Sequence, residues 1–115
     1  MDSFKELIVW QKSMKLVTEV YSLTSTFPAD ERLGLTNQMR RAAISVPSNI
    51  AEGWGRNSNG YFIQFLNIAK GSLYELETQI MISQELDFAK PDQVISDLIL
   101  EVGKMLNVLI KKLEK

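Results

Sequence analysis

The chain has 115 residues, of which 45% are hydrophobic and 23% charged, and its net charge of −1 predicts one ordinary globular domain over residues 1–115. It contains neither cysteine nor histidine, which excludes disulfides, thiolate metal sites and the commonest general base. No apolar run has the roughly 18 residues of a membrane-spanning helix and no secretory signal follows Met1, so we expect a cytoplasmic protein with no membrane contact.

Residues 4–26 have the apolar spacing of an amphipathic helix. A first row, in steps of three and four, consists of Leu7, Trp10, Met14, Val17, Tyr21 and, less clearly, Thr24. A second row beside it consists of Val9, Leu16, Val20 and Leu23. The apolar face is therefore wider than a narrow seam. We expect the helix to end at Phe27, because the residue before a proline disfavours the helical conformation.

The second helix is predicted to begin after Gly34 and to contain a proline. Its apolar side chains keep helical spacing on both sides of that proline: Leu35, Met39, Ala42 or Ala43, Val46, Ile50 and Trp54. Pro47 removes the backbone hydrogen bond to Ala43 and clashes with that turn, at a cost of about 3 kcal/mol. We therefore expect one long helix that is kinked at Pro47, and two abutting helices are the alternative.

The second helix is predicted to end in a left-handed cap at Gly53 or Gly55. Asn57 or Ser58 is expected to cap the third helix. That helix has a strict four-three spacing, typical of bundle cores, through Phe62, Leu66, Ala69, Leu73, Leu76, Ile80 and Ser83. Small residues in its middle predict the close approach of a neighbouring helix, namely Ala69, Gly71 and Ser72.

The fourth helix is predicted to follow Pro91 and to continue to the C-terminal lysines. It carries two apolar rows, which are Ile95, Leu98, Val102, Met105 and Leu109, and Ile99, Leu106, Ile110 and Leu113. Four helices with short connections and no strand pattern predict an all-α fold, an antiparallel up-down-up-down four-helix bundle. The first and fourth helices are more widely apolar than one core requires, which predicts self-association.

Positive charge is concentrated in residues 32–56, where four arginines outnumber one glutamate. Arg40 and Arg41 are adjacent, so their side chains leave a helix about 100° apart and at least one should reach solvent or an interface. We expect one of them to pair with an acid of a neighbouring helix, and phosphate or nucleic-acid contact is the alternative. The candidate residues for binding nucleic acid or a partner are Arg40, Arg41, Arg56, Lys104, Lys111 and Lys112.

The sequence assembles no recognisable catalytic or metal site. Glu52 lies four residues before Arg56, which is the favourable order for a helical ion pair, and it has no histidine or second acid nearby for acid–base chemistry. The glycines and amides of residues 53–60 lack the lysine and hydroxyl order of a P-loop, so they indicate a turn that ends a helix. We therefore predict no enzymatic activity, no metal and no cofactor.

Three stretches together resemble one known family. They are QMRRAAISVPSNIAEGWGR at 38–56, FLNIAKGSLYELETQI at 65–80, and the opening from Trp10 to Phe27-Pro28. Over nearly its whole length, the chain resembles the four-helix-bundle proteins encoded in intervening sequences of bacterial 23S ribosomal RNA genes. This resemblance implies an all-helical bundle that assembles into a homopentameric ring, and it supplies no catalytic residues. The family is similar to the accessory variability protein of diversity-generating retroelements, a basic pentamer that binds the reverse transcriptase and nucleic acid.

Two functions remain as hypotheses. The first is a non-enzymatic oligomeric scaffold or binding module for a protein partner, because the apolar rows are wide and catalytic side chains are missing. The alternative is an RNA-binding or other nucleic-acid-binding protein, associated with rRNA or a retroelement, that uses the arginines. A pI of about 5.4 separates this chain from the basic retroelement protein, since strong positive charge drives nucleic-acid binding through counterion release.

Overall fold

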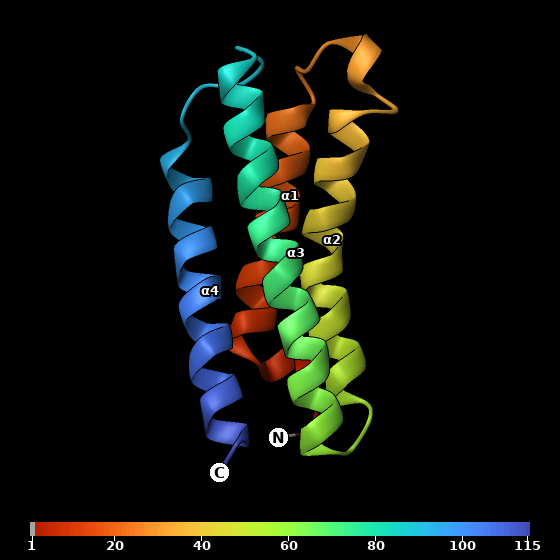
Figure 1. The fold of residues 1–115 in the computed structure, drawn as a ribbon, viewed down its shortest axis with the longest axis vertical. Helices are drawn as coiled ribbons and strands as arrows, with labels where there is room; N and C mark the ends of the chain where they lie inside the picture. Colours follow the sequence, from red (N-terminus) through yellow and green to blue (C-terminus); the bar gives the residue numbers. More distant parts are fainter. Residues whose placement is uncertain (1) are drawn as a thin grey trace.

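In the computed structural model, which describes residues 2–115, the chain forms an antiparallel bundle of four helices (Figure 1). The elements are the 3-10 turns η1 (Phe4–Glu6) and η2 (Ala29–Glu31) and the helices α1 (Ile8–Thr24), α2 (Leu35–Trp54), α3 (Asn59–Glu85) and α4 (Gln93–Leu113). Each helix packs against the next one in the chain, and α1 also packs against α4. The bundle measures 44 × 24 × 20 Å. The predicted all-α up-down-up-down bundle is confirmed.

The first helix begins later than its apolar spacing predicted. The Ser3 hydroxyl accepts a hydrogen bond from the backbone N–H of Lys5 at 3.1 Å and so starts the 3-10 turn η1. Leu7 then has extended backbone angles (φ −71°, ψ 123°), which separate this turn from α1. At the other end, Thr24 is the last residue of α1, in agreement with the stop predicted at Phe27.

The core side of α1 is the second apolar row. Val9, Leu16 and Val20 are buried, whereas Met14 and Tyr21 of the first row are 42% and 41% exposed. Both rows are apolar, so their spacing alone did not distinguish the row that faces the core from the row at its edge. The wide apolar face predicted for α1 is therefore real, and part of it remains outside the core of the single chain.

Helix α2 is continuous from Leu35 to Trp54 with Pro47 inside it. The alternative of two abutting helices is therefore wrong, while a kink at Pro47 stays a prediction. A polar contact ties this region to α3, because the hydroxyls of Ser45 and Ser72 share a 2.8 Å hydrogen bond. Within α2, the Asn49 amide donates to the Ser45 carbonyl at 2.8 Å. The bond between Ser45 and Ser72 joins α2 to α3 close to the proline.

The predicted left-handed glycine cap at the end of α2 is wrong. Gly55 has right-handed angles (φ −71°), and Asn57 takes the left-handed conformation instead (φ 55°), which asparagine tolerates better than most residues. Gly53 serves a packing purpose, because a Cβ atom there would lie 2.7 Å from Cβ of Phe65 on α3. The Ser58 hydroxyl caps α3 by accepting from the N–H of Tyr61 at 3.4 Å, one of the two caps expected.

The spacing predicted for α3 is confirmed, since all seven side chains of the four-three row are buried. Of the three small residues in its middle, Ala69 is buried and Ser72 bonds to α2, but a Cβ atom on Gly71 would meet nothing within 4 Å. Asp92, the residue after Pro91, caps α4 by accepting from the N–H of Ile95 at 3.0 Å. Within residues 2–115, no helix combines the length and the apolar character needed to cross a membrane.

Candidate functional site

The six candidate cations do not gather on one face of the single chain. Arg40 and Arg41 lie in the second turn of α2, and Arg56 follows its last residue, about 24 Å away at 1.5 Å per residue. The lysines 104, 111 and 112 are on α4, which packs against α1 and α3 and not against α2. One protomer therefore offers separate small basic regions.

Arg40 and Arg41 take different environments, as expected for adjacent helical positions. Arg40 is half-buried, its Nε donates to the hydroxyl of Thr24 at 2.9 Å, and its guanidinium lies 4.3 Å from the ring centre of Tyr21. Arg41 is exposed. The expected ion pair with an acid of a neighbouring helix is wrong, because the ion pairs among residues 2–115 involve other residues. Arg40 is held by a hydroxyl and an aromatic ring on α1 instead.

The predicted ion pair between Glu52 and Arg56 is present. Nη2 of Arg56 lies 3.3 Å from Oε1 of Glu52, and the Arg56 guanidinium also lies 5.0 Å from the ring centre of Phe65 on α3. Both charged side chains are about half exposed, so a helical pair of this kind contributes only about 0.3–0.5 kcal/mol. The contacts favour a structural role for Glu52 at the turn between α2 and α3. In the described part of the chain, no three acidic side chains lie close enough together to hold a metal ion.

An apolar groove of about 320 Å³ lies between α1 and α2. Its lining consists of six apolar residues and one serine, which are Trp10, Met14, Val17, Ile44, Pro47, Ala51 and Ser48. The first apolar row of α1 thus forms one wall. The sequence placed these residues on amphipathic helices, but it did not show that Pro47 and Ile44 form the opposite wall.

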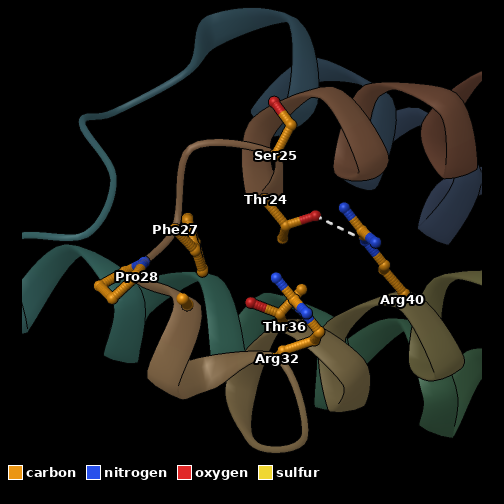
Figure 2. A pocket seen from close by; sticks show the side chains of 8 residues that line it. Thr24, Ser25, Phe27, Pro28, Arg32, Thr36 and Arg40 are labelled. Atoms are coloured by element: carbon orange, nitrogen blue, oxygen red, sulfur yellow. Dashed lines mark hydrogen bonds between the residues drawn. The ribbon is translucent and has the colours of Figure 1, made fainter.

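A second, more polar pocket of about 230 Å³ lies where α1 ends and α2 begins (Figure 2). It is lined by Thr24, Ser25, Phe27, Pro28, Ala29, Arg32, Thr36 and Arg40. A hollow that includes Tyr21, Arg41 and Ile44 shares residues with this pocket and with the apolar groove. The α1–α2 face is therefore hollowed along much of its length, with apolar side chains in the middle and arginines at one end.

Sequence reasoning missed Arg32 and Thr36 as pocket residues. Arg32 follows η2 and Thr36 is the second residue of α2, so neither belongs to the adjacent basic pair Arg40 and Arg41. The sequence showed only that residues 32–56 are rich in arginine, and Arg32 is one of the four arginines of that segment. Its position beside Arg40 depends on the turn between α1 and α2, which the periodicity of the helices does not determine.

Comparison with known proteins agrees with this fold. A crystal structure of a protein with unknown function from the S23 ribosomal protein family of Bacteroides thetaiotaomicron VPI-5482 superposes with a TM-score of 0.81 at 23% sequence identity. The superposition covers 90% of this chain and 96% of that chain, and at this identity it supports the fold alone. A search of curated proteins found no match. A family model described as 23S rRNA-intervening sequence protein matches residues 5–108. The chain therefore belongs to the 23S rRNA-intervening sequence protein family.

Proposed function

We propose that the protein is a non-enzymatic, oligomeric scaffold in which a second copy of the chain covers the α1–α2 face. The assembled copies would then present a rigid surface to a further protein partner. The observation that carries this proposal is the apolar groove between α1 and α2, whose lining has one polar residue among seven.

The exposure of the groove supports a covered state. Met14 and Ile44, on opposite walls, are 42% and 41% exposed, and Trp10 and Val17 are only partly buried. Contiguous apolar surface that is rimmed by polar residues is uncommon on monomers and marks interaction sites. A helix face of another copy would remove these side chains from water at about 25 cal/mol per Å² of apolar surface.

Charge complementarity favours a second copy as the occupant. Residues 32–56, which include α2, carry four arginines and one glutamate, while residues 57–100 of α3 and early α4 carry six acids and two lysines. The basic helix of one copy therefore complements the acidic helices of the next. Such a contact joins two different faces, and repeated contacts of this type close into a ring when the rotation permits. A homopentamer is the state implied by the resemblance to the family.

The test is the molar mass in solution, measured by light scattering after size-exclusion chromatography at micromolar concentration. We expect an oligomer for the natural chain, and a shift to monomer for Met14→Glu and Ile44→Glu, since each buries a charge in the groove contact. Val108→Glu is the matched control, because Val108 is 65% exposed near the end of α4, outside the acidic segment 57–100, and lines neither groove nor pocket. A stable monomer for the natural chain, or equal masses for all variants, would overturn the proposal. Circular dichroism confirms that each variant is folded.

Nucleic-acid binding is the second candidate, and the exposed Arg41 favours it because it has no acid partner among residues 2–115. In this case oligomerisation would have to bring the arginines and the α4 lysines of several copies together. Fluorescence anisotropy with a structured RNA should then show binding that weakens steeply with salt and with Arg41→Ala. Binding that is absent, or that does not change with salt, contradicts this candidate.

A further inference from the structure

We propose that the pocket at the junction of α1, η2 and α2 is a binding site for a phosphate group. Figure 2 shows the arrangement: Arg32 and Arg40 come from α2 and the turn before it, and Thr24 lies opposite at the end of α1. Two guanidinium groups and three hydroxyl side chains line the pocket, and no carboxylate does. The pocket lies at one end of the same α1–α2 face, joined to the apolar groove by the hollow that includes Arg41 and Ile44. Phosphate binding is therefore measured on the Met14→Glu variant as well, so that each proposal fails by its own experiment.

The structure holds Arg40 in place before any ligand arrives. Its Nε donates to the Thr24 hydroxyl, and that hydroxyl donates to the backbone carbonyl of Val20 at 2.9 Å. The ring of Tyr21, 4.3 Å from the guanidinium carbon, covers one side of the group. Only one of the five guanidinium N–H donors is used in these contacts, so the terminal N–H groups remain for a ligand. A donor that is already fixed loses little side-chain entropy on binding.

Thr36 places a further hydroxyl in the pocket. The residue is 7% exposed and lines the pocket, and its hydroxyl makes no hydrogen bond to another described residue and is not among the fully buried polar atoms. The hydroxyls of Thr24 and Ser25 differ, because both already donate to backbone carbonyls of α1. The hydroxyl keeps contact with solvent in the pocket, and it can donate to a ligand oxygen in place of water. Thr36 is therefore the neutral donor that the pocket offers.

Arg32 supplies the second positive charge. Its side chain is exposed, it lines the pocket, and it forms no ion pair within residues 2–115. Asp30 and Glu31 precede Arg32 in the chain, but neither carboxylate lines the pocket. Two permanent cations without an acid match the charge of a phosphate monoester, about −1.5 to −2, better than the single charge of a carboxylate. The ligand class is therefore a phosphate, either free or at the end of a larger molecule.

The experiment is a titration of the full-length protein with inorganic phosphate at constant ionic strength, followed through backbone amide NMR shifts. We expect shifts confined to residues near the pocket, and a Kd that rises about tenfold or more in Arg32→Gln and several-fold in Thr36→Val. Arg56→Gln is the control, because Arg56 lies at the other end of α2 and should leave the Kd unchanged. Acetate should bind more weakly than phosphate.

Several results would overturn the site. One is a Kd for inorganic phosphate that is unchanged in Arg32→Gln and Thr36→Val. Another is a set of amide NMR shifts spread equally over all cationic residues, including Arg56. The third is acetate that binds as tightly as phosphate. Arg32 is exposed and Thr36→Val keeps the side-chain shape, so both variants should fold. Repeating the titration with Met14→Glu keeps the test independent of self-association.

A 5′-phosphorylated tetranucleotide, compared with its 5′-hydroxyl form, identifies the source of the phosphate. If the 5′-phosphorylated tetranucleotide binds more tightly than inorganic phosphate and the 5′-hydroxyl form does not, the site is supported and its ligand is the phosphorylated end of a nucleic acid. Equal affinity for the tetranucleotide and inorganic phosphate supports the site with the phosphate group alone as the ligand.

Discussion

Replacing Gly53 by alanine tests how closely α2 and α3 approach. The added Cβ atom would lie 2.7 Å from Cβ of Phe65 and 3.0 Å from Cδ1 of Phe62, both on α3. Real Cβ atoms do not come so close, and Cβ of Phe65 is fixed to the α3 backbone and moves only if the helix moves. Overpacking of this kind costs about 1–3 kcal/mol, whereas the helix propensity gained near the end of α2 is below about 1 kcal/mol. We expect a net loss of about 1–2 kcal/mol in the free energy of unfolding.

Gly71→Ala is the matched control for this prediction. Gly71 lies in the middle of α3, and a Cβ atom there would meet nothing within 4 Å. Alanine should therefore stabilise the protein by about 0.5–1 kcal/mol through propensity alone. The two Gly→Ala changes should thus have opposite signs.

Urea unfolding followed by circular dichroism measures both effects. With an m value of about 2 kcal/mol/M, the midpoint should fall by roughly 0.5–1 M for Gly53→Ala and rise for Gly71→Ala. All variants must be compared at one protein concentration, because self-association shifts apparent stability. If Gly53→Ala stabilised the protein as much as Gly71→Ala, the close contact between α2 and α3 would be refuted.

Two further pairs of substitutions, each with its control, test the core assignment by the same urea measurement. Leu16→Ala should cost about 2–5 kcal/mol, because Leu16 is fully buried in the second row of α1. Ile8→Ala, at a 59% exposed position of the same helix, should change stability by less than about 1 kcal/mol, and equal losses would contradict the burial of Leu16 in the core. Gln79→Met should stabilise by about 1 kcal/mol, because the buried Oε1 of Gln79 has no hydrogen-bond partner, whereas Gln64→Met on the exposed side of α3 should have little effect. A loss of stability in Gln79→Met would show that the amide is satisfied in solution.

The fold was predictable from the sequence where local spacing determines it. The seven-residue row of α3 is buried throughout, because a regular helix fixes which side chains share a face. The choice between the two rows of α1 was not predictable, since it depends on where the other helices lie. The glycines of α2 gave a wrong prediction for a related reason. Gly53 is required by a side chain of α3, a contact between distant residues, and the left-handed conformation falls on Asn57.

The candidate sites follow the same division between local and distant contacts. The ion pair of Glu52 with Arg56 was predictable, because residues four apart on a helix meet whatever the fold. The contact of Arg40 with Thr24 joins residues 16 apart in the sequence and needs the turn between α1 and α2. The expectation of an acid partner for Arg40 failed because the neighbouring helix presents a hydroxyl and an aromatic ring at that position.

The two sides of α2 explain why one face of the bundle is open. Toward α3, α2 presents small residues, and Gly53 and Ser45 allow direct contact with Phe65 and Ser72. Toward α1, the large side chain of Ile44 remains partly exposed beside the apolar groove. The stretch from Gln38 to Arg56 therefore fixes α2 to its own bundle on one side and leaves an incompletely covered surface on the other. If a partner occupies that surface, substitutions on the α3 side should lower the stability of the protomer, whereas charges placed on the α1 side should change its assembly and leave its fold intact.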